Sequence, residues 1–165
     1  MWADRYQIRP MLVDELDRVA WLFHDLWHET QAKLQDPRKA AIRGIDFFQG
    51  RMDMPKVQTL VALEKQTIIG FARWEPGHLH SLFVAQAYRS MGFGEKLCDA
   101  VVAENHLRMG DPLQLDCVEG NWAARRFYER QGWRVSETID SIDETAEGQI
   151  VVRHWVMLRG HGGAS

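Results

Sequence analysis

Residues 88–94 read Tyr88–Arg89–Ser90–Met91–Gly92–Phe93–Gly94, and this stretch lies between a predicted strand and a predicted helix. The first turn of a helix leaves about four backbone N–H groups unpaired and carries a partial positive charge, so it can bind an anion. Glycine at 92 and 94 removes side chains that would keep phosphate oxygens away, and Arg89 adds a charged donor. The stretch therefore predicts a phosphate-binding turn, although the glycines alone would also suit a tight turn without a ligand.

Strands and helices alternate on both sides of this turn. The strand patterns cover residues 6–9, 58–64, 68–75, 78–84, 112–118, 133–139 and 150–158. The helix patterns cover residues 14–27, 36–50, 92–108 and 121–132. This order, β-α-α-β-β-β-α-β-α-β-β, predicts a mixed α/β sandwich in which residues 78–118 form a parallel strand–helix–strand crossover.

Composition limits the class of protein. The 165 residues fit a single domain, which we place at residues 1–160 with a loose tail at 161–165. Twenty Lys and Arg against 23 Asp and Glu give a net charge of −3, so neither nucleic acid nor an anionic membrane is expected as a partner. The chain shows no signal-peptide pattern and no membrane-length apolar run. Two cysteines, Cys98 and Cys117, predict buried thiols in a reducing, cytoplasmic compartment.

A second motif follows one strand after the turn. It reads Asn121-x-x-Ala124-x-x-Phe127-Tyr128-Glu129-x-x-Gly132-Trp133. Together with Arg89-x-x-Gly92-x-Gly94 and the order of the elements, this segment resembles the GCN5-related N-acetyltransferases, the GNAT family. The family's corresponding patterns are Asn-x-x-Ala-x-x-Phe-Tyr-Glu-x-x-Gly-Phe and Gln/Arg-x-x-Gly-x-Gly/Ala. The resemblance covers nearly the whole chain.

The resemblance implies a fold and a cosubstrate. The fold is of the α/β (α+β) class, a mostly antiparallel twisted sheet with one splayed parallel strand pair and helices on both faces. The cosubstrate is acetyl-CoA, and its diphosphate would lie on the backbone N–H groups of Arg89, Ser90, Met91, Gly92, Phe93 and Gly94. Its pantetheine arm would pair with the backbone of Leu82, Phe83 and Val84, with Asn121 and Tyr128 also in contact with the cosubstrate.

Acetyl transfer to an amine also needs a route for protons. The resemblance implies that Tyr128 protonates the leaving thiolate, and the alternative is a packing role beside Phe127. His78 and His80 stand at i and i+2 on a predicted strand, so they point to one face and could pass a proton outward. Such histidines can also be purely structural. Many relatives use a glutamate on this strand, and Glu75 is the nearest acid.

Three weaker signals concern the acceptor and metals. His24 and His28 have a helical metal spacing, but no third ligand is evident, so no metal is expected. The acidic segment 137–147 reads as a hairpin loop that either attracts a cationic amine or keeps the hairpin soluble. An aromatic stripe on the first helix is either core or part of an acceptor site, and comprises Trp21, Phe23 and Trp27.

These features predict an acetyl-CoA-dependent N-acetyltransferase that acts on a primary amine by direct attack in a ternary complex. A small-molecule amine is favoured because of the aromatic helix, the paired histidines and the acidic segment. The alternatives are a protein N-terminal or lysine acetyltransferase and a CoA-binding module without catalysis. An enzyme that acetylates charged tRNA fits the net charge of −3 poorly. Exposed strand edges and the terminal hairpin would allow a homodimer.

Overall fold

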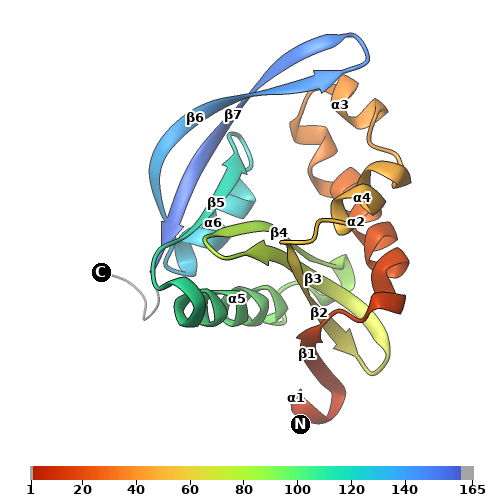
Figure 1. Cartoon of the computed structure of the whole chain (residues 1–165), viewed down its shortest axis with the longest axis vertical. Coiled ribbons are helices and arrows are strands. Elements are labelled where there is room, and N and C mark those ends of the chain that lie inside the picture. The colour runs from red at the N-terminus through yellow and green to blue at the C-terminus, as the bar shows by residue number, and fades with distance from the viewer. Residues whose placement is uncertain (1, 161–165) are drawn as a thin grey trace.

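The computed structural model describes residues 2–160 as a seven-stranded sheet with helices on both faces (Figure 1). The helices are α1 (Trp2–Arg5), α2 (Leu16–Thr30), α3 (Pro37–Ala41), α4 (Ile45–Met52), α5 (Phe93–Met109) and α6 (Trp122–Arg130), with short 3-10 turns at Val13–Glu15, Ala32–Leu34 and Gln86–Tyr88. The strands are β1 (Tyr6–Pro10), β2 (Gln58–Glu64), β3 (Thr67–Glu75), β4 (His78–Val84), β5 (Leu113–Val118), β6 (Arg134–Thr145) and β7 (Gly148–Arg159). The predicted tail at 161–165 lies outside the described residues.

The sheet order is β1-β2-β3-β4-β5-β7-β6. Within residues 2–160, each neighbouring pair of strands is antiparallel except β4 and β5, which are parallel and joined through α5. The predicted fold class and the predicted crossover are both confirmed. Antiparallel neighbours need only short turns, whereas the parallel pair requires the long connection that carries α5.

Two apolar layers cover opposite faces of the sheet. On one face α5 packs its buried Leu97, Cys98 and Val101 against strand residues such as Trp74. On the other face α2 and α4 bury side chains against Val61, Leu63 and Phe71. The strand pleat explains the division, because successive side chains along β2 and β3 point to alternate faces. The predicted burial of both cysteines is confirmed, and neither forms a disulfide.

The terminal hairpin departs from the prediction. Of residues 137–147, expected as an acidic loop, residues 137–145 lie in β6, which pairs with β7 up to Thr145 and Gly148. The long hairpin reaches across to α3, as Figure 1 shows, and Asp143 Oδ2 lies 2.5 Å from Nζ of the buried Lys39. The loop prediction was wrong because this segment continues the pairing of β6 with β7, and Asp143 within it also has a basic partner that is distant in the sequence.

One predicted helix is divided in two. Asp36 caps α3 as expected, accepting a hydrogen bond from the Arg38 N–H at 2.9 Å. The helix expected over residues 36–50 instead ends at Ala41, and α4 begins after Gly44, which has extended backbone angles. Within residues 2–160, no helix is long and apolar enough to cross a membrane.

Candidate active site

The parallel strands β4 and β5 separate soon after they meet. Their pairing is confined to His78 and Gln114, where the Gln114 N–H donates to the Gly77 carbonyl at 3.0 Å. Beyond that point a cavity of about 430 Å³ lies between β4 and β5, with wall residues from both strands. Its lining also includes Phe23 of α2 and Tyr128 of α6, which pack on opposite faces of the sheet. The cavity is therefore a passage through the sheet, and this splay was predicted from the family resemblance.

A β-bulge shapes the β4 wall of the cavity. Arg73 pairs with Ser81 and Trp74 with Leu79, so His80 is an extra residue opposite β3. Bulges of this kind re-aim side chains and are frequent beside active sites. After the bulge, residues 82–84 keep their pairing with β3, while the divergence of β5 leaves their other edge open. The backbone predicted to receive a pantetheine arm thus has no strand beside this edge, although the Val84 carbonyl accepts a hydrogen bond from Arg89 Nε.

His78 and His80 share one face, as their spacing predicted. Their ring centroids are 4.5 Å apart with planes at 21°, and both side chains line the cavity. His80 Nε2 lies 3.1 Å from Glu75 Oε1, and His78 Nε2 lies 4.0 Å from Asp116 Oδ2. Burial lowers the pKa of His80 and the neighbouring His78 lowers it further, against the opposing effect of Glu75. His80 is therefore neutral at physiological pH and able to accept a proton.

Tyr128 lies on the wall of the same cavity. Its ring packs edge-on against Phe127 and Trp133, with centroids 5.2 Å and 5.7 Å away. Burial, followed by the nearby thiols of Cys98 and Cys117, raises the pKa of the phenol above its ordinary value. The hydroxyl consequently keeps its proton at neutral pH, so Tyr128 in its resting form can donate that proton or a hydrogen bond. Packing of the Tyr128 ring beside Phe127 is therefore compatible with a role of its hydroxyl as a proton donor.

The turn at residues 88–94 has the features expected of an anion-binding helix start. Gly92 caps α5 with a positive φ of 89°, and Ser90 also has a positive φ, of 64°. Among the described residues, the backbone N–H groups of Met91, Gly92 and Gly94 meet no hydrogen-bond acceptor. A Cβ at Gly92 would face open space, with no atom within 4 Å. The turn thus presents unpaired donors to an open surface, which fits a diphosphate.

Gly94 is required for a different reason from the one inferred from the sequence. A Cβ there would lie 3.1 Å from the Phe127 ring of α6, so this glycine allows α5 and α6 to approach closely. The Arg89 side chain is also already engaged: its Nε donates to the Val84 carbonyl at 3.0 Å, and its Nη1 lies 3.2 Å from Glu29 Oε1. An incoming phosphate would compete with the Glu29 carboxylate for this guanidinium.

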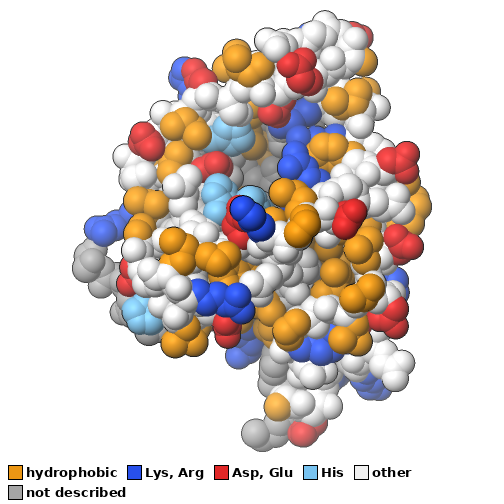
Figure 2. All heavy atoms as spheres, in the orientation of Figure 1, with side chains coloured by type: hydrophobic (Ala, Val, Ile, Leu, Met, Phe, Trp, Pro, Cys, Tyr) orange, Lys and Arg blue, Asp and Glu red, His pale blue; other side chains and the backbone are white. Residues whose placement is uncertain are grey.

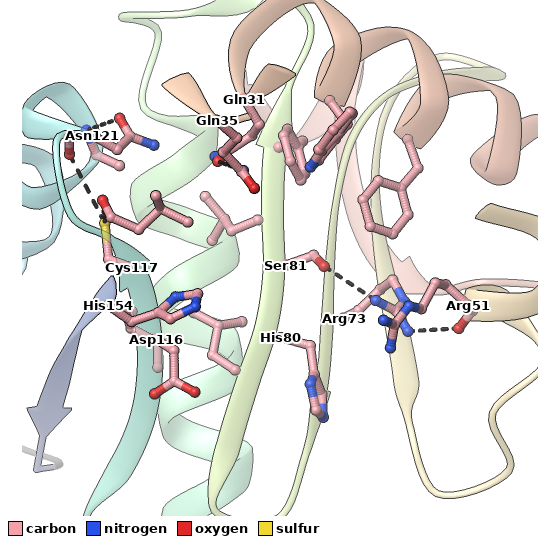
Figure 3. Close-up of a pocket in the computed structure, with 18 of the residues that line it drawn as sticks. Gln31, Gln35, Arg51, Arg73, His80, Ser81, Asp116, Cys117, Asn121 and His154 are labelled. Carbon is pink, nitrogen blue, oxygen red and sulfur yellow. Dashed lines mark hydrogen bonds between the residues drawn. The ribbon is translucent and has the colours of Figure 1, made fainter. Parts of the chain in front are cut away.

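Asn121 begins α6 and lines the cavity. Its Oδ1 accepts a hydrogen bond from the Ala124 N–H at 3.2 Å, which caps the helix. Figure 3 shows its amide nitrogen on the cavity side, where it remains available as a donor. The same close-up shows Cys117 beneath it, and the Cys117 thiol contacts the Asn121 carbonyl at 3.9 Å. Burial raises the pKa of this thiol to about 11, so it is not a reactive thiolate.

Sequence reasoning missed the polar wall contributed by α2–α4, β3 and the hairpin. Arg73 of β3 is buried and lines the cavity beside Ser81, while His154 and Asp116 line the opposite side (Figure 3). The remaining basic residues of this wall are Lys39, Arg43 and Arg51. The aromatic residues Phe23 and Trp27 are both core and cavity lining. Trp21 is half exposed and lies outside the cavity.

No metal centre is visible in the part of the chain that the structure describes, where no group of three or more metal-ligating side chains converges. The His24 and His28 rings lie 4.6 Å apart but have other partners. His24 Nδ1 lies 2.9 Å from Asp25 Oδ1, and His28 Nε2 lies 2.6 Å from the Arg43 carbonyl.

Comparison with solved structures places this fold among acetyltransferases. A GCN5-related N-acetyltransferase from Rhodopseudomonas palustris is 20% identical, with 94% of this chain and 96% of that chain covered and a TM-score of 0.72. PaiA N-acetyltransferase from Thermoplasma acidophilum, solved with coenzyme A, is 16% identical over 94% and 99% of the two chains, with a TM-score of 0.72. Arabidopsis thaliana NAA60, solved with acetyl-CoA, is 16% identical over 96% and 99%, with a TM-score of 0.70.

A search of curated proteins found no match. The model of the acetyltransferase (GNAT) domain family, by contrast, matches residues 27–143, which is well over half of the chain. This matched range contains the splayed strands, the helix-start turn and Tyr128. The protein therefore belongs to the GNAT family of acetyltransferases.

Proposed function

We propose that the protein transfers an acetyl group from acetyl-CoA to the primary amine of a small molecule, by direct attack within a ternary complex. One observation carries the proposal: the passage between β4 and β5 connects the two faces of the sheet, with Tyr128, His78 and His80 on its wall. The cosubstrate would enter from the α5 and α6 face, and the acceptor from the α2–α4 face. Neighbours solved with acetyl-CoA or coenzyme A share the fold.

The residues at the α5 and α6 face fit such a cosubstrate. The unpaired N–H groups of Met91, Gly92 and Gly94 would bind the diphosphate. The free edge of β4 at residues 82–84 would pair with the amide groups of the pantetheine arm, as an added strand does. The Asn121 amide nitrogen would give one further donor.

The acceptor amine must first lose the proton of its ammonium form, because a protonated amine has no lone pair. In our proposal, His80 and His78 take this proton and deliver it toward Glu75 and Asp116 at the ends of the stack. The amine nitrogen then forms a bond to the acyl carbon, and the bond from that carbon to sulfur breaks. Tyr128 gives its proton to the leaving thiolate, and the second proton lost by the nitrogen restores the phenol.

A small acceptor is supported by the size of the cavity and by the hairpin that borders it. The hairpin is held against α3 by the Asp143–Lys39 ion pair, and residues of the hairpin line the acceptor side of the cavity. A cavity of about 430 Å³ is within the range of small-molecule sites. A protein N-terminus or lysine would need to enter beneath the hairpin, and this is the alternative within the same chemistry.

The test is release of free thiol from acetyl-CoA with a panel of small amines and of peptides with free N-termini or lysines. We expect turnover with small amines and a much lower kcat/KM with peptides. Turnover with peptides alone would instead support the alternative, a protein N-terminal or lysine acetyltransferase. Tight acetyl-CoA binding without thiol release for every acceptor would favour a binding module without catalysis.

A further inference from the structure

We propose that the acceptor carries an anionic group, a carboxylate or a phosphate ester, in addition to its amine, and that Arg73, Arg51 and Arg43 bind that group. This inference rests on the proposed acetyl transfer, because it names the class of molecule that occupies the acceptor side. The anionic group would be held at one wall of the cavity and the amine at the other.

The charges on the cavity wall are not balanced. The basic lining residues are Lys39, Arg43, Arg51 and Arg73, and the acidic ones are Asp116 and Asp143. Asp143 is paired with Lys39, and Asp116 lies on the histidine side, 4.0 Å from His78. Across residues 2–160, no carboxylate lies within ion-pair distance of any of the three arginines. The cavity thus has an excess of positive charge although the chain as a whole has a net charge of −3.

Arg73 is the centre of this excess. Only 3% of its surface is exposed, and its guanidinium donates to Ser81 Oγ at 3.1 Å, to the Arg51 carbonyl at 2.6 Å and to Met54 Sδ at 3.6 Å. Its Nε is buried without any acceptor. These neutral partners orient the guanidinium but do not neutralise it (Figure 3). A buried charge is unfavourable unless it is paired. An anionic group of the ligand would supply the counter-charge that the Arg73 guanidinium lacks in the protein alone.

Arg43 and Arg51 extend the same wall. Their guanidiniums lie 4.5 Å and 5.0 Å from the centre of the Phe47 ring, and Arg43 also lies 4.6 Å from that of Trp27. Stacking on aromatic rings fixes a guanidinium while leaving its edge for hydrogen bonds to an anion. Burial, together with the like charge of Arg51, lowers the pKa of Arg73 to about 10. Burial likewise lowers the pKa of Arg43 to about 10. The nearby charge of Asp143 partly offsets the effect of burial on the pKa of Arg43, whereas no carboxylate offsets the effect of burial on Arg73.

The phosphates of CoA do not account for this wall. The turn at residues 88–94 begins α5 on one face of the sheet, whereas α2 and α4 pack on the other. Figure 2 shows a hollow with Lys and Arg side chains along one side and His side chains along the opposite side. In Figure 3, Asp116 and His154 lie on one side, Arg73 and Arg51 on the other, and His80 between them. The two ends fit a molecule with an ammonium at one end and an anion at the other.

Matched acceptor pairs test the charge directly. Each of a set of α- and ω-amino acids is compared with its primary amide, and O-phosphoethanolamine is compared with ethanolamine. We expect the anionic member of the best pair to have a kcat/KM at least about tenfold higher than its neutral partner. Preference within the amino-acid pairs identifies a carboxylate, and preference within the ethanolamine pair identifies a phosphate ester. Equal use of both members, or preference for the neutral member, in all pairs overturns the proposal.

Variants test whether the arginines cause the preference for an acceptor with an anionic group. Arg51→Gln changes an exposed residue, and Arg73→Lys keeps the charge but loses the planar donor geometry. We expect each to raise the KM for the anionic acceptor about tenfold, with the KM for acetyl-CoA and for the neutral amide unchanged. The matched control is Arg134→Gln, because Arg134 is an exposed arginine of β6 that lies outside the cavity. This variant should leave the KM values for the anionic acceptor, the neutral amide and acetyl-CoA unchanged. An equal change in the KM for the anionic and the neutral acceptor in Arg51→Gln would contradict the assignment of Arg51 to the anion-binding wall.

A failure of the proposed function can be distinguished from a failure of this inference. If no amine in the panel is acetylated, the same amino acids and O-phosphoethanolamine are titrated into the CoA-loaded protein by calorimetry. Binding that is lost in Arg51→Gln and kept in Arg134→Gln would uphold the anion site although the acceptor chemistry had been misassigned. Absence of binding by every anionic amine would overturn the anion site itself.

Discussion

The imidazole rings of His78 and His80 stack 4.5 Å apart, and a carboxylate lies at each end of the stack. Glu75 contacts His80 at 3.1 Å, and Asp116 lies 4.0 Å from His78. The pair thus provides two proton-accepting groups in series on the wall of the cavity, and Glu75 orients the His80 ring through a hydrogen bond. The i, i+2 spacing puts both rings on one face of β4, and the bulge at His80 lies within this pair.

The acidic limb of the kcat/KM profile should lie below about pH 6.5, since His80 must be neutral to accept a proton and burial lowers its pKa. Glu75 raises the pKa of His80, so Glu75→Gln should move this limb to still lower pH. The measurement is kcat/KM against pH with one acceptor, and Glu104→Gln on the exposed surface of α5 is the control. A limb that stays in place in both Glu75→Gln and the double variant His78→Gln/His80→Gln would remove the histidines from the proton path.

Tyr128→Phe should lower kcat by about 10²-fold or more, because the thiolate would leave without a proton donor. The ring contacts with Phe127 and Trp133 are retained, so folding and the KM for acetyl-CoA should change little. Steady-state kinetics and a thermal melt measure these quantities together. An unchanged kcat would restrict Tyr128 to packing.

Gly92→Ala should weaken acetyl-CoA binding at least about tenfold, because the added Cβ would project into the space beside the unpaired N–H groups. The control is Gly148→Ala in the β6–β7 turn. Gly148 has a comparable positive φ, of 116° against 89°, and likewise has no atom within 4 Å of an added Cβ. Both variants carry the backbone strain, but calorimetry should show lost affinity in Gly92→Ala alone. Similar affinity in the two variants would count against the turn as the diphosphate site.

A buried ion pair at the start of α2 should make stability depend on pH. Glu15 is buried, accepts from Arg9 at 2.6 Å and from the Leu12 N–H at 2.8 Å, and these bonds hold its pKa at about 2 against an ordinary 4.5. A depressed carboxyl pKa stabilises the fold above the ordinary value and loses that effect as the pH falls toward the lower one.

The Glu15 contribution should therefore be about 3 kcal/mol at pH 7 and about 1 kcal/mol at pH 3. Urea unfolding of the native protein and Glu15→Gln at the two pH values measures it. The free-energy difference between the two proteins should narrow on acidification. A difference that is the same at pH 7 and pH 3 would contradict the depressed pKa.

The sequence predicted the parts of the site that local patterns determine. The glycine-containing turn at residues 88–94 indicated a helix start, and the i, i+2 spacing placed His78 and His80 on one face. The order of the main strands and helices was also predicted, because strand and helix periodicities are local properties of the chain, but the division of the helix expected over residues 36–50 and the extension of the terminal hairpin were not. The roles of Tyr128 and Asn121 in catalysis and cosubstrate binding stay predictions, although both residues line the cavity.

The basic wall was not predictable, because it depends on contacts between distant segments. Arg73 reads as one polar residue in an otherwise apolar strand, and nothing nearby indicates that Ser81 and the Arg51 carbonyl will bind it. Lys39 and Asp143 likewise give no sign in the sequence that they pair. A buried, unpaired arginine can be recognised only when the packing around it is known.

The most direct test of the account is a crystal structure of the protein with acetyl-CoA. The account predicts the diphosphate on the N–H groups of Met91, Gly92 and Gly94, the pantetheine arm along the open edge of residues 82–84, and the thioester sulfur within hydrogen-bond reach of the Tyr128 hydroxyl. A diphosphate bound away from this turn, or a thioester outside the passage between β4 and β5, would contradict it.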